Sequence, residues 1–293
     1  MTKAVHIRKN RKRDLPSSER QAAMAAQDQI IKDALSLVKH KFIVMSGKGG
    51  VGKTSVAANL AMALSRQGAR VGLMDVDLHG PDIPRILGLS GVLEASVDGR
   101  ITPKPYSEDL EVVSVGSMAG DPDKAVIWRG PLKLQVIRRF ISDVHWGMLD
   151  YLIIDSPPGT GDEPLTVAQN IPDAKAIIVT MPQEMSLGDV RKSINFCKTV
   201  EMEVLGLIEN MSGFVCPHCG KAIDLFGSGG GLRTAKAMDI PFLGRIPLDA
   251  RMVACADAGE SYMEKYPDSE TTKAFAQIVA TIMGGGQIRA AVV

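Results

Sequence analysis

Short apolar runs alternate along most of the chain with longer segments in which apolar residues recur at helical spacing. The runs predict buried strands at residues 41–46, 70–74, 110–115, 151–154, 176–180, 204–208 and 242–244. Helical spacing predicts helices at residues 17–38, 55–67, 130–144, 187–200, 233–238 and 269–283, with a short helix at 85–87. Continuous apolar strands separated by helices are typical of a parallel sheet covered on both faces. The pattern therefore predicts a doubly wound α/β fold with a mostly parallel sheet flanked by helices.

The same pattern predicts one domain, because the chain has no internal repeat and no long linker between its periodic segments. Residues 1–16 are expected to form a basic flexible tail, and residues 284–293 a loose glycine-rich one. Residues 17–283 would form the domain, including a cysteine pair at 216–219. The first predicted helix is expected to pack beside the first strand.

Composition narrows the class of protein. Of 293 residues, 45% are hydrophobic and 23% charged, as in an ordinary soluble domain. The net charge of +1 does not favour a nucleic-acid or membrane partner, and no apolar run reaches the length of a membrane span. We find no signal peptide, and the four cysteines do not form the pattern of a secreted disulfide framework. A cytoplasmic enzyme that binds neither DNA nor membranes is the expectation.

A glycine-rich loop joins the first predicted strand to an Ala/Leu-rich helix. Its residues have the spacing G-x-x-x-x-G-K-T: Gly47, Lys48, Gly49, Gly50, Val51, Gly52, Lys53 and Thr54, followed by Ser55. Glycines allow successive backbone N–H groups to face one anion, and the helix N-terminus adds the positive end of its dipole. Lys53 could then reach the β- and γ-phosphates of a nucleotide, and Thr54 could place its hydroxyl on Mg²⁺.

Lys48 is unusual, because a phosphate-binding loop does not need a second lysine directly after its first glycine. It lies too close to the backbone of its own loop to act only locally. One interpretation is that it crosses a dimer interface and stabilises charge on the partner's nucleotide, as an arginine finger does. The alternative is an ordinary surface lysine.

Carboxylates follow two further predicted strands, at the edge of the sheet where ligands bind. Asp155, after an apolar run, fits the role of holding Mg²⁺, and Asp77 fits that of orienting the attacking water. Asp75 could instead cap a neighbouring backbone group. The segment after Asp155 combines rigid prolines with glycines, so it could take one of two shapes according to the nucleotide bound.

Cys216 and Cys219 form a single C-x-x-C motif. A tetrahedral Zn²⁺ or an iron–sulfur cluster requires four ligands, and a symmetric dimer would supply them as two pairs. A redox disulfide and a weaker Zn²⁺ site that includes His218 are the alternatives. Cys197 and Cys255 lie in helical segments and are expected to be buried thiols.

The adenine base has candidate contacts after the last two strands. Asn210 follows a strand, and an amide can pair with both hydrogen-bonding edges of adenine. Pro247 and Asp249 could form the other wall of a base pocket, although Asp249 is also a good helix N-cap. The glycine-rich residues 227–231 lack a lysine and are interpreted as a flexible turn.

The sequence GKGGVGKT resembles the deviant Walker A motif of dimeric P-loop NTPases that include MinD, ParA and the nitrogenase iron protein. Further strings are similar to the Mrp/ApbC branch of iron–sulfur cluster carriers. They are DVDLHGPDIP at 75–84, WRGPL at 128–132, DYLIIDSPPGTGDE at 150–163, NMSGFVCPHCG at 210–220 and PFLGRIPLD at 241–249. The N-terminal cysteine cluster of longer eukaryotic relatives is absent here.

The resemblance implies a cytosolic homodimeric ATPase that holds a 4Fe–4S cluster between subunits and transfers it to apoproteins. Lys48 would reach the partner's ATP, Lys53 and Thr54 would contact the γ-phosphate and Mg²⁺, and Asn210 would read the adenine. Asp77 and Asp155 would belong to two switch loops. Cys216 and Cys219 would bind the cluster.

Two other functions use the same fold. A positioning ATPase of the MinD or ParA kind would need a basic amphipathic C-terminal helix or a basic surface, and residues 284–293 contain a single arginine. A nitrogenase-like electron donor usually has its two cluster cysteines far apart in sequence, whereas here they share one motif. Both remain alternatives to the cluster carrier.

Overall fold

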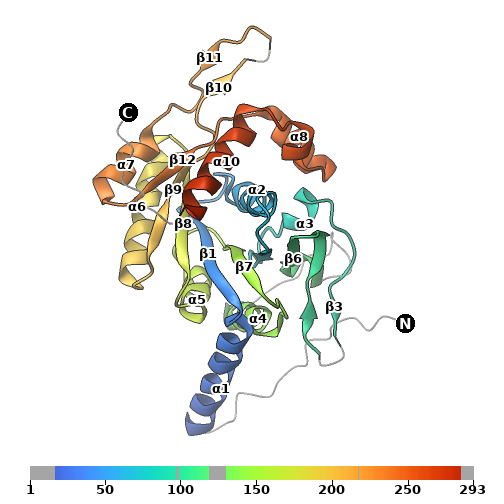
Figure 1. Cartoon of the computed structure of the whole chain (residues 1–293). Helices are drawn as coiled ribbons and strands as arrows, with labels where there is room; N and C mark the ends of the chain where they lie inside the picture. Colours follow the sequence, from blue (N-terminus) through green and yellow to red (C-terminus); the bar gives the residue numbers. More distant parts are fainter. Residues whose placement is uncertain (1–16, 97–98, 119–129, 217, 285–293) are drawn as a thin grey trace.

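An eight-stranded sheet forms the centre of the structure, a computed structural model that describes residues 17–96, 99–118, 130–216 and 218–284 (Figure 1). The strand order is β12-β9-β8-β1-β7-β2-β6-β5, and every neighbouring pair is parallel except β5 with β6. The predicted tails at 1–16 and 285–293, and Trp128 and Arg129 of one family string, lie outside the described residues.

The strands follow the apolar runs closely. Their bounds are β1 (Val38–Ser46), β2 (Val71–Asp75), β5 (Lys104–Ser107), β6 (Leu110–Ser114), β7 (Leu149–Asp155), β8 (Lys175–Thr180), β9 (Val204–Glu209) and β12 (Phe242–Arg245). In β1, Phe42 and Val44 pack into one core and Ile43 and Met45 into the other, because successive side chains point to opposite faces. Burial on both faces explains why these strands are continuously apolar.

Helices cover both faces of the sheet (Figure 1). One core includes residues of α2 (Lys53–Ser65), α3 (Ile83–Ile86), α8 (Ala250–Ala258), α9 (Tyr262–Lys265) and α10 (Glu270–Met283). The other includes residues of α1 (Ser17–Leu35), α4 (Gly130–Asp143), α5 (Asp162–Asn170), α6 (Glu184–Thr199) and α7 (Gly230–Met238). The predicted doubly wound, mostly parallel α/β fold is confirmed.

Several predicted details were wrong. The first helix ends at Leu35, and Val38 opens β1, where it pairs in register with Leu149 of β7. Helix α1 packs on α4 rather than beside β1, and an ion pair of 2.7 Å joins Asp28 to Arg138. No strand was predicted between residues 87 and 110, where the structure has β3 (Glu94–Ala95), β4 (Ile101–Thr102) and β5. Helix α5 was not predicted either.

The cysteine motif lies outside the main sheet. Strands β10 (Phe214–Val215) and β11 (Ala222–Ile223) form a two-stranded hairpin that projects from the end of the molecule at which β9 and β12 finish (Figure 1). Among the described helices, none combines the length and the hydropathy that crossing a bilayer requires.

Candidate nucleotide and metal site

The glycine-rich loop leaves the carboxyl end of β1 and enters α2. Gly50 and Gly52 have φ angles of 80° and 79°, in the left-handed region that glycine adopts without steric cost. Lys53 is the first residue of α2, so the first N–H groups of that helix have no acceptor within it. The loop and the helix therefore offer the anion-binding arrangement that the sequence predicted.

Two of these glycines are also required by close packing. A Cβ on Gly47 would lie 2.4 Å from the carbonyl carbon of Asp189 in α6, and one on Gly52 would lie 2.3 Å from Nδ2 of Asn210. At Gly49, by contrast, no atom of the described residues lies within 4 Å of the Cβ position. The contact with α6 has no signal in the sequence, because Asp189 is distant along the chain.

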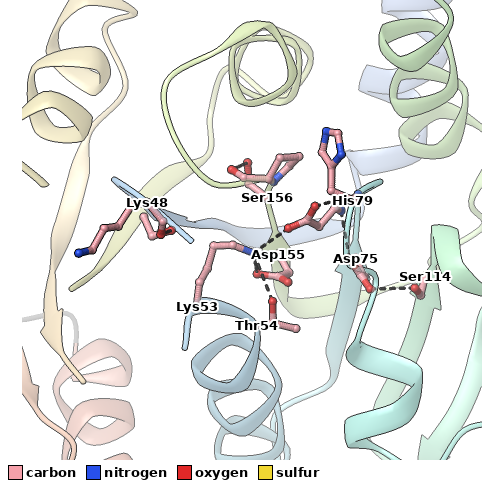
Figure 2. Close-up of polar contacts among 11 residues, drawn as sticks. Lys48, Lys53, Thr54, Asp75, His79, Ser114, Asp155 and Ser156 are labelled. Atoms are coloured by element: carbon pink, nitrogen blue, oxygen red, sulfur yellow. Dashed lines mark hydrogen bonds and ion pairs between the residues drawn. The ribbon is translucent and has the colours of Figure 1, made fainter. Parts of the chain in front are cut away.

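Lys53 lies at the centre of a buried cluster of charges (Figure 2). Its Nζ is 2.5 Å from Oδ1 of Asp155 and 3.6 Å from Oδ2 of Asp77. The hydroxyl of Thr54 is 3.4 Å from the same Nζ. The structure thus brings together four residues that the sequence proposed for one site, from the phosphate loop and the ends of β2 and β7.

Asp155 fits the role of a ligand for a hard cation. It is fully buried, and its Oδ2 has no hydrogen-bond partner among the described residues. Burial raises the pKa of this carboxyl above its usual range, although Lys53 acts in the opposite direction. The buried carboxylate oxygen and the hydroxyl of Thr54 are oxygen donors of the kind that Mg²⁺ binds, and phosphates and water would supply the remaining ligands.

Asp75, unlike Asp155, has hydrogen-bond partners for both of its carboxylate oxygens. It is the register partner of Asp155 on β2, and its carboxylate accepts hydrogen bonds from the hydroxyl of Ser114 at 2.8 Å and from the N–H of Asp77 at 3.1 Å. Burial and the charge of Asp155 raise the pKa of Asp75 well above its usual range. The interpretation of Asp75 as a strand-end carboxylate that caps a neighbouring backbone group is confirmed.

Lys48 is set apart from this cluster. Its carbonyl accepts the hydroxyl of Ser46 at 2.9 Å, which fixes the backbone at the start of the loop. Its side chain is half-buried and points away from Lys53 and Asp155 (Figure 2). This direction agrees with a side chain that does not act on the nucleotide of its own loop.

A second polar cluster joins the loop after β2 to the start of α5. His79 Nε2, from the loop after β2, lies 3.2 Å from Oε1 of Glu163 in α5. Lys133 of α4 lies 3.0 Å from both groups. No role was predicted for these residues, although His79 and Glu163 lie within the family strings, because their contact depends on three separate elements.

The cysteine hairpin exposes its thiols. The N–H of Cys216 donates to Lys221 at 2.9 Å and the N–H of Gly220 to Cys216 at 2.9 Å, which closes the turn around the motif. The backbone N–H groups of His218 and Cys219 lower the pKa of the Cys216 thiol. Cys216 is half-buried and Cys219 exposed. Thiolate is the form that binds metals, so this turn favours a metal ligand.

The other two cysteines are buried, as predicted. Burial raises the pKa of Cys197 to about 11, and burial likewise raises the pKa of Cys255. Neither thiol is available to a metal site in this fold. Within the described ranges, no group of three or more His, Cys, Asp or Glu side chains is arranged to bind a metal.

Two of the residues predicted to contact the adenine base, Asn210 and Asp249, are hydrogen-bonded to other residues of the protein. Asn210 is buried, and its Nδ2 donates to the carbonyl of Val51 in the phosphate loop at 2.9 Å. Asp249 caps α8 through the N–H of Arg251, and its carboxylate also accepts from the Arg251 side chain and the Tyr262 hydroxyl. Pro247 lies two residues before this cap, half-buried. Their contact with adenine stays a prediction.

A parallel sheet that presents a glycine-rich loop, a lysine and a buried aspartate at adjacent strand ends defines a P-loop NTPase. Residues 37–283 match the family described as ParA: NUBPL iron-transfer P-loop NTPase, and the chain belongs to that family. The predicted resemblance is thereby confirmed at the level of the family.

Relatives and solved structures agree with this placement. The iron-sulfur cluster carrier protein of Methanocaldococcus jannaschii is 47% identical over 261 residues, 89% of each chain. The cytosolic Fe-S cluster assembly factor NUBP2 of Rattus norvegicus is 42% identical and covers 85% of this chain and 94% of its own. A nucleotide-binding protein from Archaeoglobus fulgidus in complex with ADP is 39% identical, covers 79% of this chain and 91% of its own, and has a TM-score of 0.70. The cell division ATPase MinD of Pyrococcus furiosus is 25% identical, covers 84% and 99%, and has a TM-score of 0.63.

Proposed function

We propose that this protein binds and hydrolyses ATP and carries an iron–sulfur cluster, which it transfers to apoproteins. The main support for the proposal is the direct connection between the phosphate loop and the segment that carries the thiols. Asn210 is hydrogen-bonded to Val51 of the loop, and the hairpin that bears Cys216 and Cys219 begins four residues later, at Phe214. The printed names of the relatives, an iron-sulfur cluster carrier and a cluster assembly factor, support the same function.

The cargo is a 4Fe–4S cluster shared between two copies of the chain. A cluster of this kind takes four thiolates. One chain offers two accessible thiols, since Cys197 and Cys255 are buried in the fold. A symmetric dimer in which each copy contributes Cys216 and Cys219 completes the set. Zn²⁺ in place of the cluster would need the same four ligands.

The nucleotide is held by the loop from Gly47 to Ser55. Lys53, which is paired with Asp155 in the structure, would contact the phosphates when ATP binds. Thr54 and Asp155 would hold Mg²⁺, whose charge would offset that of the β- and γ-phosphates. Asn210, Pro247 and Asp249 would contact the adenine.

Hydrolysis breaks the bond between the γ-phosphorus and the bridging oxygen, and water supplies the new oxygen. Asp77 orients this water, and Lys48 of each copy stabilises the charge on the phosphates bound to the other. Little covalent chemistry is needed from the protein, so turnover depends on how well the two copies align these groups. Slow hydrolysis is therefore expected.

Anaerobic reconstitution with iron and sulfide tests the carrier function. The wild type is expected to bind about two iron atoms per chain, since four irons are shared by two chains, and to show the absorption of a 4Fe–4S cluster. The Cys216→Ala, Cys219→Ala double variant should bind none. Cys255→Ala, which removes a buried thiol, is the matched control and should retain full loading.

Metal analysis separates the outcomes. Iron binding by the double variant equal to that of the wild type would overturn the cluster assignment. Zinc in the purified wild type, with no gain of iron or sulfide on reconstitution, would replace the cluster by a Zn²⁺ site. Transfer is tested by following activation of an apo iron–sulfur enzyme that receives the loaded protein.

We also propose that the protein acts in the cytoplasm without a DNA or membrane partner. The word cytosolic in the names of several relatives supports this location. Co-sedimentation with DNA or anionic vesicles in the presence of ATP is the test. Nucleotide-dependent binding to either would favour a positioning ATPase instead.

A further inference from the structure

Glu209 is a fully buried carboxylate that the proposed chemistry does not use. It is the last residue of β9 and directly precedes Asn210. Its Oε1 accepts hydrogen bonds from the hydroxyl of Ser212 at 2.5 Å and from the N–H of Gly229 at 2.9 Å. Its Oε2 accepts the N–H of Gly231. A buried charge with several donors around it is stabilised only as long as those donors stay in place.

The donors lie on both sides of the cysteine hairpin. Ser212 comes just before β10, whereas Gly229 and Gly231 follow β11 at the start of α7. Both ends of the hairpin are therefore attached to one carboxylate. The side chain of Arg245 in β12 adds a positive charge, with its Nε 3.6 Å from Oε1 of Glu209.

The glycine-rich residues 227–231 acquire a specific role from this contact. They are not merely a flexible turn, since Gly230 and Gly231 open helix α7. A Cβ on Gly231 would lie 2.9 Å from both Oε2 of Glu209 and Cδ2 of Leu207, so a larger residue would displace the carboxylate or the start of the helix. The prediction of a turn holds for residues 227–229, which precede α7, and was wrong for Gly230 and Gly231, which belong to the helix. Their contact with Glu209 could not be predicted because Glu209 is distant in sequence.

Asn210 and Met211, which follow Glu209, contact the phosphate loop. Asn210 donates to Val51, and a Cβ on Gly52 would lie 2.3 Å from Asn210 Nδ2 and 3.3 Å from Cε of Met211. Met211 has a φ of 54°, in a region that few non-glycine residues occupy. Such a backbone is held only where its surroundings fix it on both sides.

We propose that Glu209 is a positioning residue that fixes the cysteine hairpin relative to the phosphate loop. Nucleotide binding then changes the position and the accessibility of the Cys216 and Cys219 thiols. The loop acts on Asn210, and Glu209 passes the displacement to both ends of the hairpin through Ser212, Gly229 and Gly231. The purpose of this coupling rests on the proposed function, whereas the coupling itself does not require a cluster.

Thiol alkylation of the cluster-free protein tests the coupling. Full-length protein with reduced thiols is treated with iodoacetamide, without nucleotide and with ATP and Mg²⁺, and modification of Cys216 and Cys219 is followed by peptide mass spectrometry. In the wild type, ATP is expected to change the alkylation rate about fivefold or more, the size of a typical coupling between sites. In Glu209→Gln the rates with and without ATP should be equal.

Glutamine keeps the shape of the side chain but turns an N–H₂ group toward backbone N–H donors. The hydrogen bonds from Gly229 and Gly231 therefore cannot both form. A purely structural loss would raise both alkylation rates and leave their ratio unchanged. Hydrolysis of ATP by Glu209→Gln should stay within about twofold of the wild type if the two sites are separable. Glu203→Gln, which removes an exposed ion pair with Lys175 near the start of β9, is the matched control.

The proposal is overturned if ATP has no effect on the wild-type rates, or if Glu209→Gln keeps the wild-type ratio. Should Glu209→Gln fail to fold, Ser212→Ala, which removes one donor, must lower the ratio for the proposal to stand. Failure of the carrier function is a separate result. The wild type could bind no iron and still show an ATP response that is lost in Glu209→Gln. This result would refute the iron–sulfur cargo and support the positioning role of Glu209.

Discussion

Lys53 Nζ lies 2.5 Å from Oδ1 of Asp155, while Oδ2 of the same carboxylate has no partner among the described residues. The lysine that would bind phosphate thus neutralises the carboxylate that would bind the metal. Under the proposed function, entry of a nucleotide with Mg²⁺ would replace this ion pair by a contact of Lys53 with phosphate and a contact of Asp155 with the metal. Each buried charge would then keep a partner of opposite sign.

Asp155→Asn should lower Mg²⁺-dependent ATP hydrolysis by about 100-fold or more, because the neutral amide is a poor ligand for Mg²⁺ and cannot balance Lys53. Phosphate release measured across a Mg²⁺ titration checks this. Asp173→Asn removes an equal charge from the pair with Lys41, away from the site, and should change hydrolysis little. Hydrolysis by Asp155→Asn above half the wild-type rate would refute the assignment.

Lys48→Ala should lower hydrolysis by about 100-fold if the lysine stabilises charge on the partner's nucleotide. Affinity for ATP should change little, because the side chain of Lys48 points away from Lys53 and Asp155 of its own chain (Figure 2). Phosphate release and equilibrium nucleotide binding are measured side by side. Lys192→Ala, at an exposed lysine near the loop, is the control. Hydrolysis and cluster transfer that both survive in Lys48→Ala would exclude a cross-subunit role.

Gly52→Ala should destabilise the nucleotide-free protein by at least about 1–2 kcal/mol, since alanine is strained at a φ of 79°. The new Cβ would also meet the side chain of Asn210. Gly49→Ala, where none of the described atoms lies near the Cβ position, should change stability by less than about 0.5 kcal/mol. Urea denaturation measures both. Equal effects from the two substitutions would contradict this account of the loop.

Asp75→Asn should make the nucleotide-free protein more stable at neutral pH. Burial raises the pKa of Asp75 above its ordinary value of 3.8, so the folded state binds the proton more tightly than the unfolded state does. The stability of the wild type therefore falls as the pH rises from about 3.8 through the raised pKa.

Asparagine removes this dependence, and the gain at pH 7 should be about 1–2 kcal/mol. Ser114 can keep its contact by turning its hydroxyl. Urea denaturation between pH 4 and pH 8, without Mg²⁺, should show the gain shrinking toward the acid end. A variant less stable than the wild type at pH 7 would count against this explanation.

Asp249 titrates with the opposite sign. Burial alone would raise its pKa, but hydrogen bonds from Arg251 and Tyr262 lower it from 3.8 to about 2. The stabilisation is complete above pH 3.8 and is lost as the pH falls toward 2. Asp249→Asn keeps a good N-cap but loses the charge.

The cost of Asp249→Asn at pH 7 should be about 0.5–1 kcal/mol, because Arg251 is half-exposed and solvent screens the pair. Below pH 4 the difference from the wild type should shrink. Thermal or urea unfolding at pH 3 and pH 7 makes the comparison. A difference that is constant with pH would assign the effect to the cap alone.

The main sheet and the phosphate loop could be predicted from the sequence because both depend on local signals. Apolar runs mark strands that are buried on both faces, and the spacing of Gly47, Gly52 and Lys53 specifies a loop between strand and helix. The short strands β3, β4 and β5 were missed, because each is held by pairing with another segment rather than by its own pattern.

The contacts between site residues could not be predicted in the same way. Glu209 carries no motif, and its donors become neighbours only when β9 and the start of α7 pack together. The pairing of His79 with Glu163 likewise depends on the parallel arrangement of β2 and β7, which brings the loops after them together. Spacing along the chain reveals residue types at strand ends, and only the fold reveals which of them touch.

The cysteine hairpin has two residues in each strand, and Val215, Ile223 and Leu225 on or beside it are about half-exposed. A two-stranded ribbon without a core of its own is marginally stable. Part of the free energy with which Cys216 and Cys219 bind a cargo must therefore order the segment that carries them. Delivery returns this free energy, which lowers the affinity that must be overcome when the cargo is transferred. The empty hairpin is then expected to be more open to a protease than the strands of the main sheet.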